Sequence, residues 1–461
     1  MLFNSFVYIL LFLPFVFGAY FLISKYTNYT MAKVFLVFAS LFFYGYWKPV
    51  YLYLLLSSII INYLIASFIQ RQRSRTISQW GLIFGIIFNI ALLAYFKYAN
   101  FFIDNVNAAV DTHIMLKKII LPLGISFFTF TQIAFLVGNH RGLAKKGSFL
   151  NYCLFVSYFP HLLAGPIIHH AQMMPQFENK NNAYINYKNI YFGIVLFSIG
   201  LIKKVVIADT FAIFANNGYA HVGDLDTTTA WITSLAYTFQ IYFDFSGYTD
   251  MALGASKLLN IDLPINFNSP YKSLSIQDFW RRWHITLSNF LRDYLYIPLG
   301  GNRVSEFKIQ RNLILTFLLG GIWHGAGWNF IFWGLLHGSA LSIQRMFGKL
   351  NIALPKLLCW FITFNFINIT WVFFRADGTK DALLLIAKMF SFTSLTSFNP
   401  LLGLMFVIAL FIVTRTPNSK QISDMQMTDS LIFIPVVSLI ILISILAMEV
   451  SSSHAFIYFQ F

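Results

Sequence analysis

The chain has 461 residues, of which 58% are hydrophobic and 11% are charged, and its formal net charge is +15 at pH 7. A soluble domain carries about 25% charged and about 45–50% apolar residues, so this composition excludes a water-soluble globule. Most of the chain must therefore be surrounded by lipid. The positive residues lie between apolar runs, which is typical of cytoplasmic loops that meet anionic lipid headgroups, and we expect no nucleic-acid partner.

Apolar runs predict many membrane spans, because a bilayer core of about 30 Å needs about 20 apolar residues per helix. We expect spans at about 5–23, 31–46, 50–69, 80–97, 119–138, 149–167, 189–212, 228–244, 311–323, 328–346, 353–375, 397–414 and 430–449. Pro122, Pro160 and Pro166 predict breaks, which are tolerated where protein surrounds them. No Lys or Arg precedes the first run and no clean cleavage pattern follows it, so we expect a retained span rather than a signal peptide.

Loop charges and polar stretches predict the organisation of the chain. Arg71 and Arg75 follow the third span, so the positive-inside rule places that loop in the cytoplasm and the N-terminus outside. Residues 171–188 read as a polar loop. Residues 260–310 are rich in Arg and Trp, and we expect amphipathic or re-entrant helices there. We predict an all-α polytopic membrane protein with a single domain over residues 1–461.

Two carboxylates follow an apolar run in the segment YFDFSGYTD, residues 242–250. An ionised Asp at bilayer depth costs at least ~2.5–3.5 kcal/mol on insertion scales. Asp244 and Asp250 therefore need partners or a water-filled cavity. Two interpretations stay open: the carboxylates line a pocket, or they hold neighbouring Arg or Trp groups.

The segment FWRRWHITLS, residues 279–288, combines aromatic, cationic and imidazole side chains. Helical spacing places Trp280 and Trp283 on one face, and Arg281 and His284 on another. The segment could anchor a surface helix at the interface. Alternatively, guanidinium groups could hold the phosphates of a donor molecule. The residues that would do so are Arg281, Arg282 and Arg292.

The segment GGIWHGAGW, residues 320–328, places His324 among four glycines. A neutral imidazole can act as a general base near pH 7. The alternative is a tight helix contact in which His324 bonds a carbonyl. His337 follows, but on one continuous helix it would point about 220° away from His324, unless the helix breaks at the glycines. We therefore expect His337 to be structural. No Cys/His cluster has zinc-ligand spacing, so we expect no metal.

Several blocks of this chain resemble the membrane-bound O-acyltransferase family, and within it the bacterial alginate O-acetylases and peptidoglycan O-acetyltransferases. The blocks are FDFSGYTDMALG (243–254), FNSPYKSLSIQDFWRRWHITLSNFLRDYLYIPLGGNR (267–303), LGGIWHGAGWNFIFWGLLHG (319–338), LLAGPI (162–167) and FFYGYW (42–47). The resemblance implies a helical bundle with a central tunnel, which a cytoplasmic acyl thioester enters from one side and an acceptor hydroxyl from the other.

The resemblance also implies roles for single residues. The near-invariant histidine of the family falls on His324, and its second active-site position falls on His284, which could orient the donor or the thioester carbonyl. His337 matches a further histidine of this branch. His161 departs from the pattern, because a Gln is expected there, and this weakens any assignment of the neighbouring tunnel wall. From their chemistry, we expect Trp280, Arg281, Arg282 and Asp244 to bind the donor, and we expect the catalytic core to span about 230–340.

The implied activity is O-acetylation of an extracytoplasmic polysaccharide such as alginate or peptidoglycan. Acetyl-CoA would be the donor, and the enzyme would lie in the bacterial cytoplasmic (inner) membrane among its lipids. A secreted or periplasmic SGNH-type, esterase-like protein would be its partner. Acyl transfer needs a base for the hydroxyl proton, which His324 can provide.

The C-terminal tail, residues 450–461, ends in FIYFQF. It resembles the C-terminal tyrosine motif of the small protein that works with the D-alanine-transferring member of the family, where the tyrosine is thought to carry the acyl group. Tyr458 is the matching residue. A phenol has a pKa near 10, so an imidazole could deprotonate it during attack. The alternative is an aromatic anchor at the membrane interface.

Other functions remain as alternatives. A transporter or flippase of a cell-envelope glycan precursor would carry midplane charges on paired broken helices, whereas the polar residues here gather in the central third. A glycosyltransferase could use the Asp-x-Asp spacing of Asp224 and Asp226, but this spacing is weak evidence and a solvated loop explains these residues better. A non-catalytic scaffold would not need both histidines.

Overall fold

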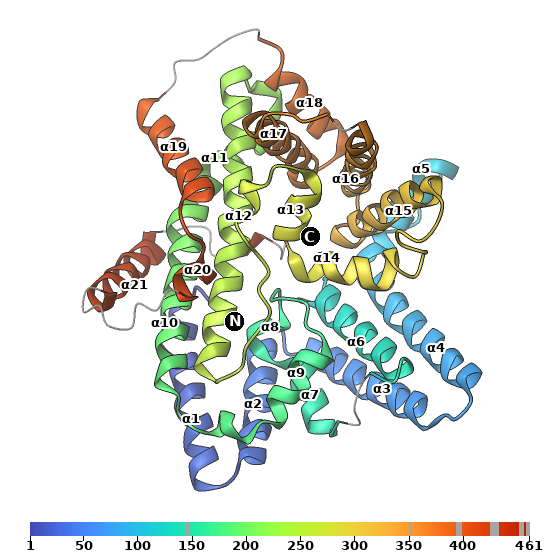
Figure 1. The fold of residues 1–461 in the computed structure, drawn as a ribbon, viewed down its shortest axis with the longest axis vertical. Coiled ribbons are helices and arrows are strands. Elements are labelled where there is room, and N and C mark those ends of the chain that lie inside the picture. The colour runs from blue at the N-terminus through green and yellow to red at the C-terminus, as the bar shows by residue number, and fades with distance from the viewer. Residues whose placement is uncertain (144–146, 351, 393–398, 425–432, 451–455, 458–461) are drawn as a thin grey trace. The chain divides into compact units, whose positions relative to one another are not determined.

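The computed structural model describes residues 1–143, 147–350, 352–392, 399–424, 433–450 and 456–457, and in these ranges every regular element is a helix. Figure 1 labels these helices in chain order, and the chain divides into two compact units. The first comprises Met1–Phe197 and Tyr248–Pro264, and the second comprises Ser198–Gly247 and Ile265–Phe461. The predicted all-α fold is confirmed. The single domain over residues 1–461 stays a prediction.

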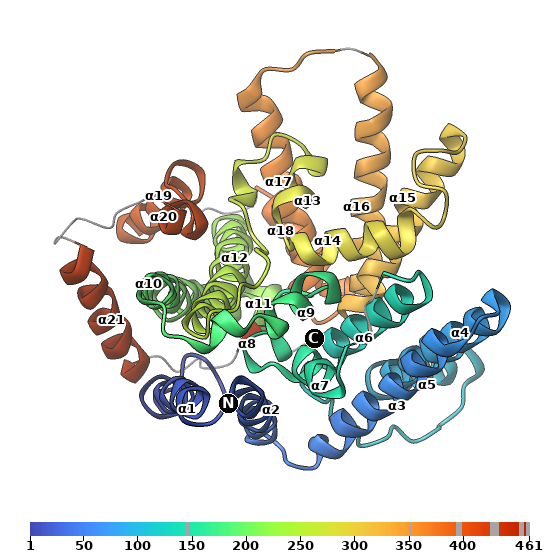
Figure 2. The ribbon, with the colours of Figure 1, turned by 60° about the horizontal axis from the view of Figure 1, so that its bottom comes forward.

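The first unit is built from helices of the N-terminal half. They are α1 (Leu13–Tyr26), α2 (Tyr29–Gly45), α3 (Tyr51–Arg71), α4 (Arg75–Leu93), α5 (Ala99–Val110), α6 (Ile125–His140), α7 (Phe149–Ser157), α8 (Phe159–Leu162), α9 (His170–Glu178) and most of α10 (Tyr187–Ile202). Helices α3, α4 and α6 pack together (Figure 2). Buried amides join α3 to α4, since the Nδ2 of Asn89 donates to the Oδ1 of Asn62 at 2.6 Å. Such bonds join helices where no water can solvate an amide.

Five helical stretches of the described residues are long and apolar enough to cross a membrane. They are Val7–Tyr26, Tyr51–Arg71, Arg75–Val110, Tyr187–Ala220 and Lys356–Arg375. Shorter apolar helices occupy Tyr29–Gly45, Pro400–Arg415 and Ile434–Glu449. Each of the thirteen expected spans overlaps a helix within its described residues, but several of these helices are too short or too polar to count as candidate spans by length and composition.

The expected breaks lie where the prolines predict them. Helix α6 begins only after Pro122, and Gly124 precedes it with a φ of 73°. The α7 helix ends before Tyr158, and α8 restarts with Pro160 in its first turn. Prolines lack the amide hydrogen that an interior helical position donates, so they favour these starts.

The prediction of a loop over residues 171–188 is wrong, because α9 covers its first part. Pro175 lies inside this helix. The side-chain amide of Gln176 ties the end of this helix to a distant segment. Its Oε1 accepts the main-chain N–H of Asp262 at 2.7 Å, and its Nε2 donates to the Asp262 carbonyl at 2.9 Å. Local composition does not reveal such a long-range contact.

The second unit is built from the remaining helices. They are α11 (Asp209–Ala220), the first part of α12 (Thr227–Leu258), α13 (Ile276–Arg282), α14 (Ile285–Leu291), α15 (Glu306–His324), α16 (Trp328–Phe347), α17 (Lys356–Arg375), α18 (Thr379–Met389), α19 (Pro400–Arg415), α20 (Ser419–Asp424) and α21 (Phe433–Val450). The polar stretch 260–310 contains the short helices expected there, α13 and α14. Ser275 caps α13, since its hydroxyl accepts the N–H of Asp278 at 3.1 Å.

Helices α15 and α16 form a tight hairpin because glycines line their contact (Figure 2). A Cβ added at Gly334 would collide with the carbonyl oxygen of Phe317, and one at Gly338 would lie 2.7 Å from the Cα of Ile314. Small residues let helix backbones approach closely in a membrane. The glycine-rich sequence therefore sets the spacing of the helices that carry His324 and His337.

Replacing Gly334 by Ala should destabilise the protein, because overpacking a close contact costs about 1–3 kcal/mol. Gly18→Ala is the matched control, since a Cβ there meets no atom within 4 Å. We expect a lower thermal unfolding midpoint in detergent for Gly334→Ala and an unchanged or higher one for Gly18→Ala. Equal midpoints would contradict the close approach of α15 and α16.

Candidate active site

Histidine and tryptophan rings alternate through the interior of the second unit. The ring centroids of His284 and Trp323 lie 6.4 Å apart, and those of Trp323 and His324 lie 5.0 Å apart. Trp333 lies 5.0 Å from His324 and 4.7 Å from His337. All five side chains are buried. Both predicted catalytic histidines therefore belong to one cluster of rings, the His/Trp cluster.

A break between α15 and α16 brings His324 and His337 to the same ring. Helix α15 ends at His324, and α16 begins at Trp328 after an extended Gly327. The break occurs at the glycines. On one continuous helix the two imidazoles would point apart, and this break allows both to contact the same ring. Trp333 then separates the two imidazoles.

His284 lies outside regular helix. Helix α13 ends at Arg282, and His284 takes a left-handed conformation with φ 43° and ψ 52° just before α14. The prediction that Arg281 and His284 share a helix face is therefore wrong, because the helix stops between them. Arg281 is exposed, whereas the His284 side chain is fully buried.

Burial sets the charge of His284. Desolvation disfavours the imidazolium and lowers the pKa of His284 to about 3. The ring is neutral at physiological pH, so one of its nitrogens holds a lone pair. The edge of Phe245 lies against the ring, with centroids 4.9 Å apart. A neutral imidazole in apolar surroundings is suited to hydrogen bonding with a substrate.

Trp280 joins the His/Trp cluster to a pocket. Its Nε1–H donates to the Nδ1 of His337 at 3.2 Å. Because an indole can only donate, the proton of a neutral His337 lies on Nε2. This contact gives His337 a positioning role for Trp280, in keeping with the structural role that we expect for it.

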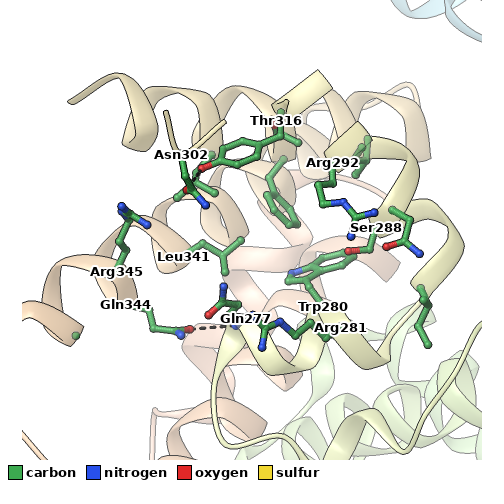
Figure 3. Close-up of a pocket in the computed structure, with 17 residues that line it drawn as sticks. Gln277, Trp280, Arg281, Ser288, Arg292, Asn302, Thr316, Leu341, Gln344 and Arg345 are labelled. Carbon is green, nitrogen blue, oxygen red and sulfur yellow. Dashed lines mark hydrogen bonds between the residues drawn. The ribbon is translucent and has the colours of Figure 1, made fainter. Parts of the chain in front are cut away.

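The pocket has a volume of about 640 Å³, within the range of small-molecule sites, and Figure 3 shows its lining. Three guanidinium groups line it. Arg292 is paired with Asp293 at 2.7 Å, and Arg345 is paired with Glu306 from α15, also at 2.7 Å. Among the described residues, no carboxylate pairs with Arg281, the third. The polar lining also includes Gln277, Ser288, Asn289, Tyr296, Asn302, Thr316 and Gln344.

Arg282 does not line this pocket. It bonds Asp278 one turn earlier in α13, with Nε 2.9 Å from Oδ1. The structure thus places Trp280, Arg281 and Arg292 around one pocket but directs Arg282 to its own helix. The two interpretations of the FWRRWH segment both stay predictions, with Arg281 in the lining of a pocket and Arg282 paired within α13.

Asp244 is part of a buried ion cluster and does not line the pocket. Its Oδ1 lies 2.7 Å from the Nζ of Lys204, and the same ammonium lies 2.8 Å from Asp209. All three side chains are at most 7% exposed. The sequence analysis did not single out this lysine. The feature that could have identified it is the pair Lys203 and Lys204 inside the apolar run 189–212. The expected span over 228–244 stays a prediction, and the helix that contains it, α12, continues to Leu258.

Part of the C-terminal tail is buried in the same unit. The main-chain N–H of Ile457 donates to the second oxygen of Asp244 at 2.8 Å. The ring of Phe456 lies 5.7 Å from that of Phe245, which itself contacts His284. Tyr458, the predicted acyl carrier, lies outside the described residues. The residue before it, Ile457, is held by Asp244, whose neighbour Phe245 contacts His284.

Comparison with known sequences adds a family to this geometry. Residues 113–386 match the family described as MBOAT, membrane-bound O-acyltransferase. No group of three or more His, Cys, Asp or Glu side chains in the described ranges could hold a metal ion.

Individual relatives are similar over most of the chain. A peptidoglycan O-acetyltransferase of Helicobacter pylori is 51% identical over 419 residues, which cover 84% of this chain and 80% of that protein. A probable alginate O-acetylase, AlgI, of Pseudomonas aeruginosa is 42% identical over 403 residues, covering 85% and 75%. A teichoic acid D-alanyltransferase of Bacillus subtilis is 31% identical over 268 residues, covering 53% and 66%.

Proposed function

The chain belongs to the membrane-bound O-acyltransferase family, and from this premise we propose that it acetylates a polysaccharide outside the bacterial inner membrane. It is a multi-pass membrane acyltransferase. The observation that carries the proposal is the His/Trp cluster, because it joins His284 and His324 to an arginine-lined pocket through Trp280. Relatives named for peptidoglycan and alginate acetylation support a cell-envelope polymer as the acceptor.

Acetyl-CoA is the proposed donor. Its phosphates would lie at Arg281 and Arg292, since planar guanidinium groups bind phosphates in a bidentate manner. Trp280 separates these arginines from His337 and lines the pocket. The pocket would then hold the charged part of the donor while the thioester points toward the histidines.

The reaction is an acyl transfer. His324 takes the proton of the attacking hydroxyl, and the oxygen forms a bond to the thioester carbonyl carbon. The carbon–sulfur bond then breaks, and His324 returns the proton to the leaving thiolate. An O-acetyl ester and free CoA thiol result, and no oxidant or metal takes part. We assign His284 to the positioning of the reacting groups.

The attacking hydroxyl of the first transfer is proposed to be the phenol of Tyr458. Support comes from its neighbours, because Phe456 and Ile457 are buried and Asp244 accepts the N–H of Ile457. An aryl ester is a reactive donor, so a second transfer could pass the acetyl group to a polymer hydroxyl. A secreted SGNH-type partner would perform that second step.

His324→Ala should lower acetylation by about 10²–10⁴-fold, the usual contribution of a general base. His221→Ala is the matched control, because this histidine is exposed and bonds only its own helix, at the Asn217 carbonyl. The measurement is acetyl transfer from labelled acetyl-CoA in membrane vesicles with equal protein levels. Normal transfer by His324→Ala would refute the assignment.

Arg281→Ala should raise the KM for acetyl-CoA by about 10–100-fold with a smaller change in kcat, since a hydrogen bond to a charged group contributes about 1.5–3 kcal/mol. Arg303→Ala, which removes an exposed arginine outside the pocket, is the control. Steady-state kinetics of the purified protein in liposomes measure both. An unchanged KM in Arg281→Ala would show that this arginine does not hold the donor.

Tyr458→Phe keeps an aromatic ring and removes the nucleophile, so polymer acetylation should be lost at normal protein levels. Mass spectrometry of the wild-type C-terminal peptide should show acetyl-tyrosine, enriched when the secreted partner is absent. Tyr184→Phe, at an exposed tyrosine, is the control. Full activity of Tyr458→Phe would contradict the carrier role of Tyr458 and would indicate direct transfer of the acetyl group from thioester to polymer.

A further inference from the structure

We propose that Asn266 is a positioning residue that fixes the tautomer of His284, so that Nδ1 carries the proton and Nε2 presents a lone pair to the substrates. This inference rests on the proposed function, which places His284 at the reacting groups. Asn266 lies in the non-helical segment before α13 and is 1% exposed.

Three donors converge on one atom of Asn266. The main-chain N–H and the hydroxyl of Thr286 lie 3.2 Å and 2.9 Å from its Oδ1. The Nδ1 of His284 lies 3.1 Å from the same atom. Because a main-chain N–H can only donate, the atom that it meets must be the amide oxygen. The contact with Thr286 thus identifies which atom of the Asn266 amide is the oxygen and which is the nitrogen.

The identity of that oxygen determines the tautomer. An amide oxygen can only accept, so the Nδ1 of His284 must be the donor in the bond between them. Burial keeps the ring neutral, and a neutral imidazole carries a single proton. The proton on Nδ1 therefore leaves Nε2 as a hydrogen-bond acceptor.

Asn266 also holds the backbone around His284. Its carbonyl oxygen accepts the N–H of Ile285 at 3.0 Å, and the N–H of Asn268 donates to the carbonyl of Arg282 at 2.9 Å. His284 lies between these two bonds with a φ of 43°. A left-handed conformation at a non-glycine residue costs on the order of 1–3 kcal/mol and persists only where surrounding bonds hold it. Side chain and main chain of Asn266 thus fix the same imidazole.

The tautomer restricts what His284 can do. With a lone pair on Nε2, the ring cannot donate a hydrogen bond to a thioester carbonyl, so it cannot stabilise the oxyanion that forms there. It can accept a bond from an O–H or N–H group of the substrates. Of the two roles expected for His284, orientation of the donor is compatible with this tautomer, whereas orientation of the thioester carbonyl by a donated hydrogen bond is not.

Nitrogen NMR of the histidine-labelled full chain in liposomes tests the tautomer directly. The His284 signals are identified by their loss in His284→Gln. We expect a protonated Nδ1 and an unprotonated Nε2 in the wild type, and loss of this pattern in Asn266→Leu. Asn89→Leu is the matched control, because Asn89 is equally buried and bonds Asn62 and the Gly85 carbonyl. A wild-type ring protonated at Nε2 would overturn the proposal without reference to any variant.

Kinetics supply a second readout. Asn266→Leu should lower kcat by about 10²-fold or more with little change in the KM for acetyl-CoA, because a wrong tautomer can cost up to about 10⁴-fold. Asn266→Asp keeps an acceptor for Nδ1 and should recover most of the rate. Wild-type kcat together with a wild-type tautomer signal in Asn266→Leu would refute the role of Asn266.

The pH profile separates positioning from mere packing. Among the described residues, the side chains shown to contact the His284 ring are Phe245, Asn266 and Trp323, which carry no charge, and the Asp244 carboxylate, next to Phe245 in the chain, is bound by Lys204. A carboxylate in Asn266→Asp favours the imidazolium and raises the pKa of His284. The neutral ring is then lost at a higher pH as the solution is acidified, so the acid limb of the activity profile should move upward. An unmoved acid limb in an active Asn266→Asp enzyme would contradict the proposal.

These readouts also distinguish the inference from the function on which it rests. Full activity of His284→Gln would refute the catalytic placement of His284. The NMR signals of the wild type and of Asn266→Leu test the tautomer alone.

Discussion

One buried ammonium, that of Lys204, satisfies two carboxylates in the interior of the second unit. An ion left unpaired in such surroundings costs several kcal/mol, so the cluster forms as a whole or not at all. Asp244 lies in α12, and the next residue, Phe245, packs against His284. The second oxygen of Asp244 accepts the N–H of Ile457. The carboxylate that pairs with Lys204 therefore also holds this part of the tail.

The sequence predicted those features that rest on local pattern. Apolar runs predicted helices, prolines predicted the breaks before α6 and at α8, and glycines predicted the interruption between His324 and His337. It did not predict contacts between residues far apart in the chain. Lys204 and Asp244 lie in different apolar runs, and no periodicity links them. The bond between Asn266 and His284 likewise depends on the fold, because an asparagine before a proline-containing turn is also an ordinary loop residue.

The candidate site was predicted in the same uneven way. Family resemblance pointed to His284 and His324, and the structure shows both in the His/Trp cluster, whereas residue chemistry alone suggested that both arginines of the FWRRWH segment hold the donor. The structure places Arg281 in the lining of the pocket, while Arg282 bonds Asp278. Hydrogen bonds from Trp280 to His337 and from His284 to Asn266 give these two imidazoles opposite proton positions.

The ion cluster has a further electrostatic consequence. The cluster of Lys204, Asp209 and Asp244 brings two carboxylates and one ammonium together in buried surroundings, where fields are weakly screened. The pocket that Arg281, Arg292 and Arg345 line attracts anions instead. A donor with phosphates at one end and an uncharged acyl group at the other would therefore be oriented by its charge. Its anionic end would be retained at the arginines, and only the neutral acyl group could move toward the interior.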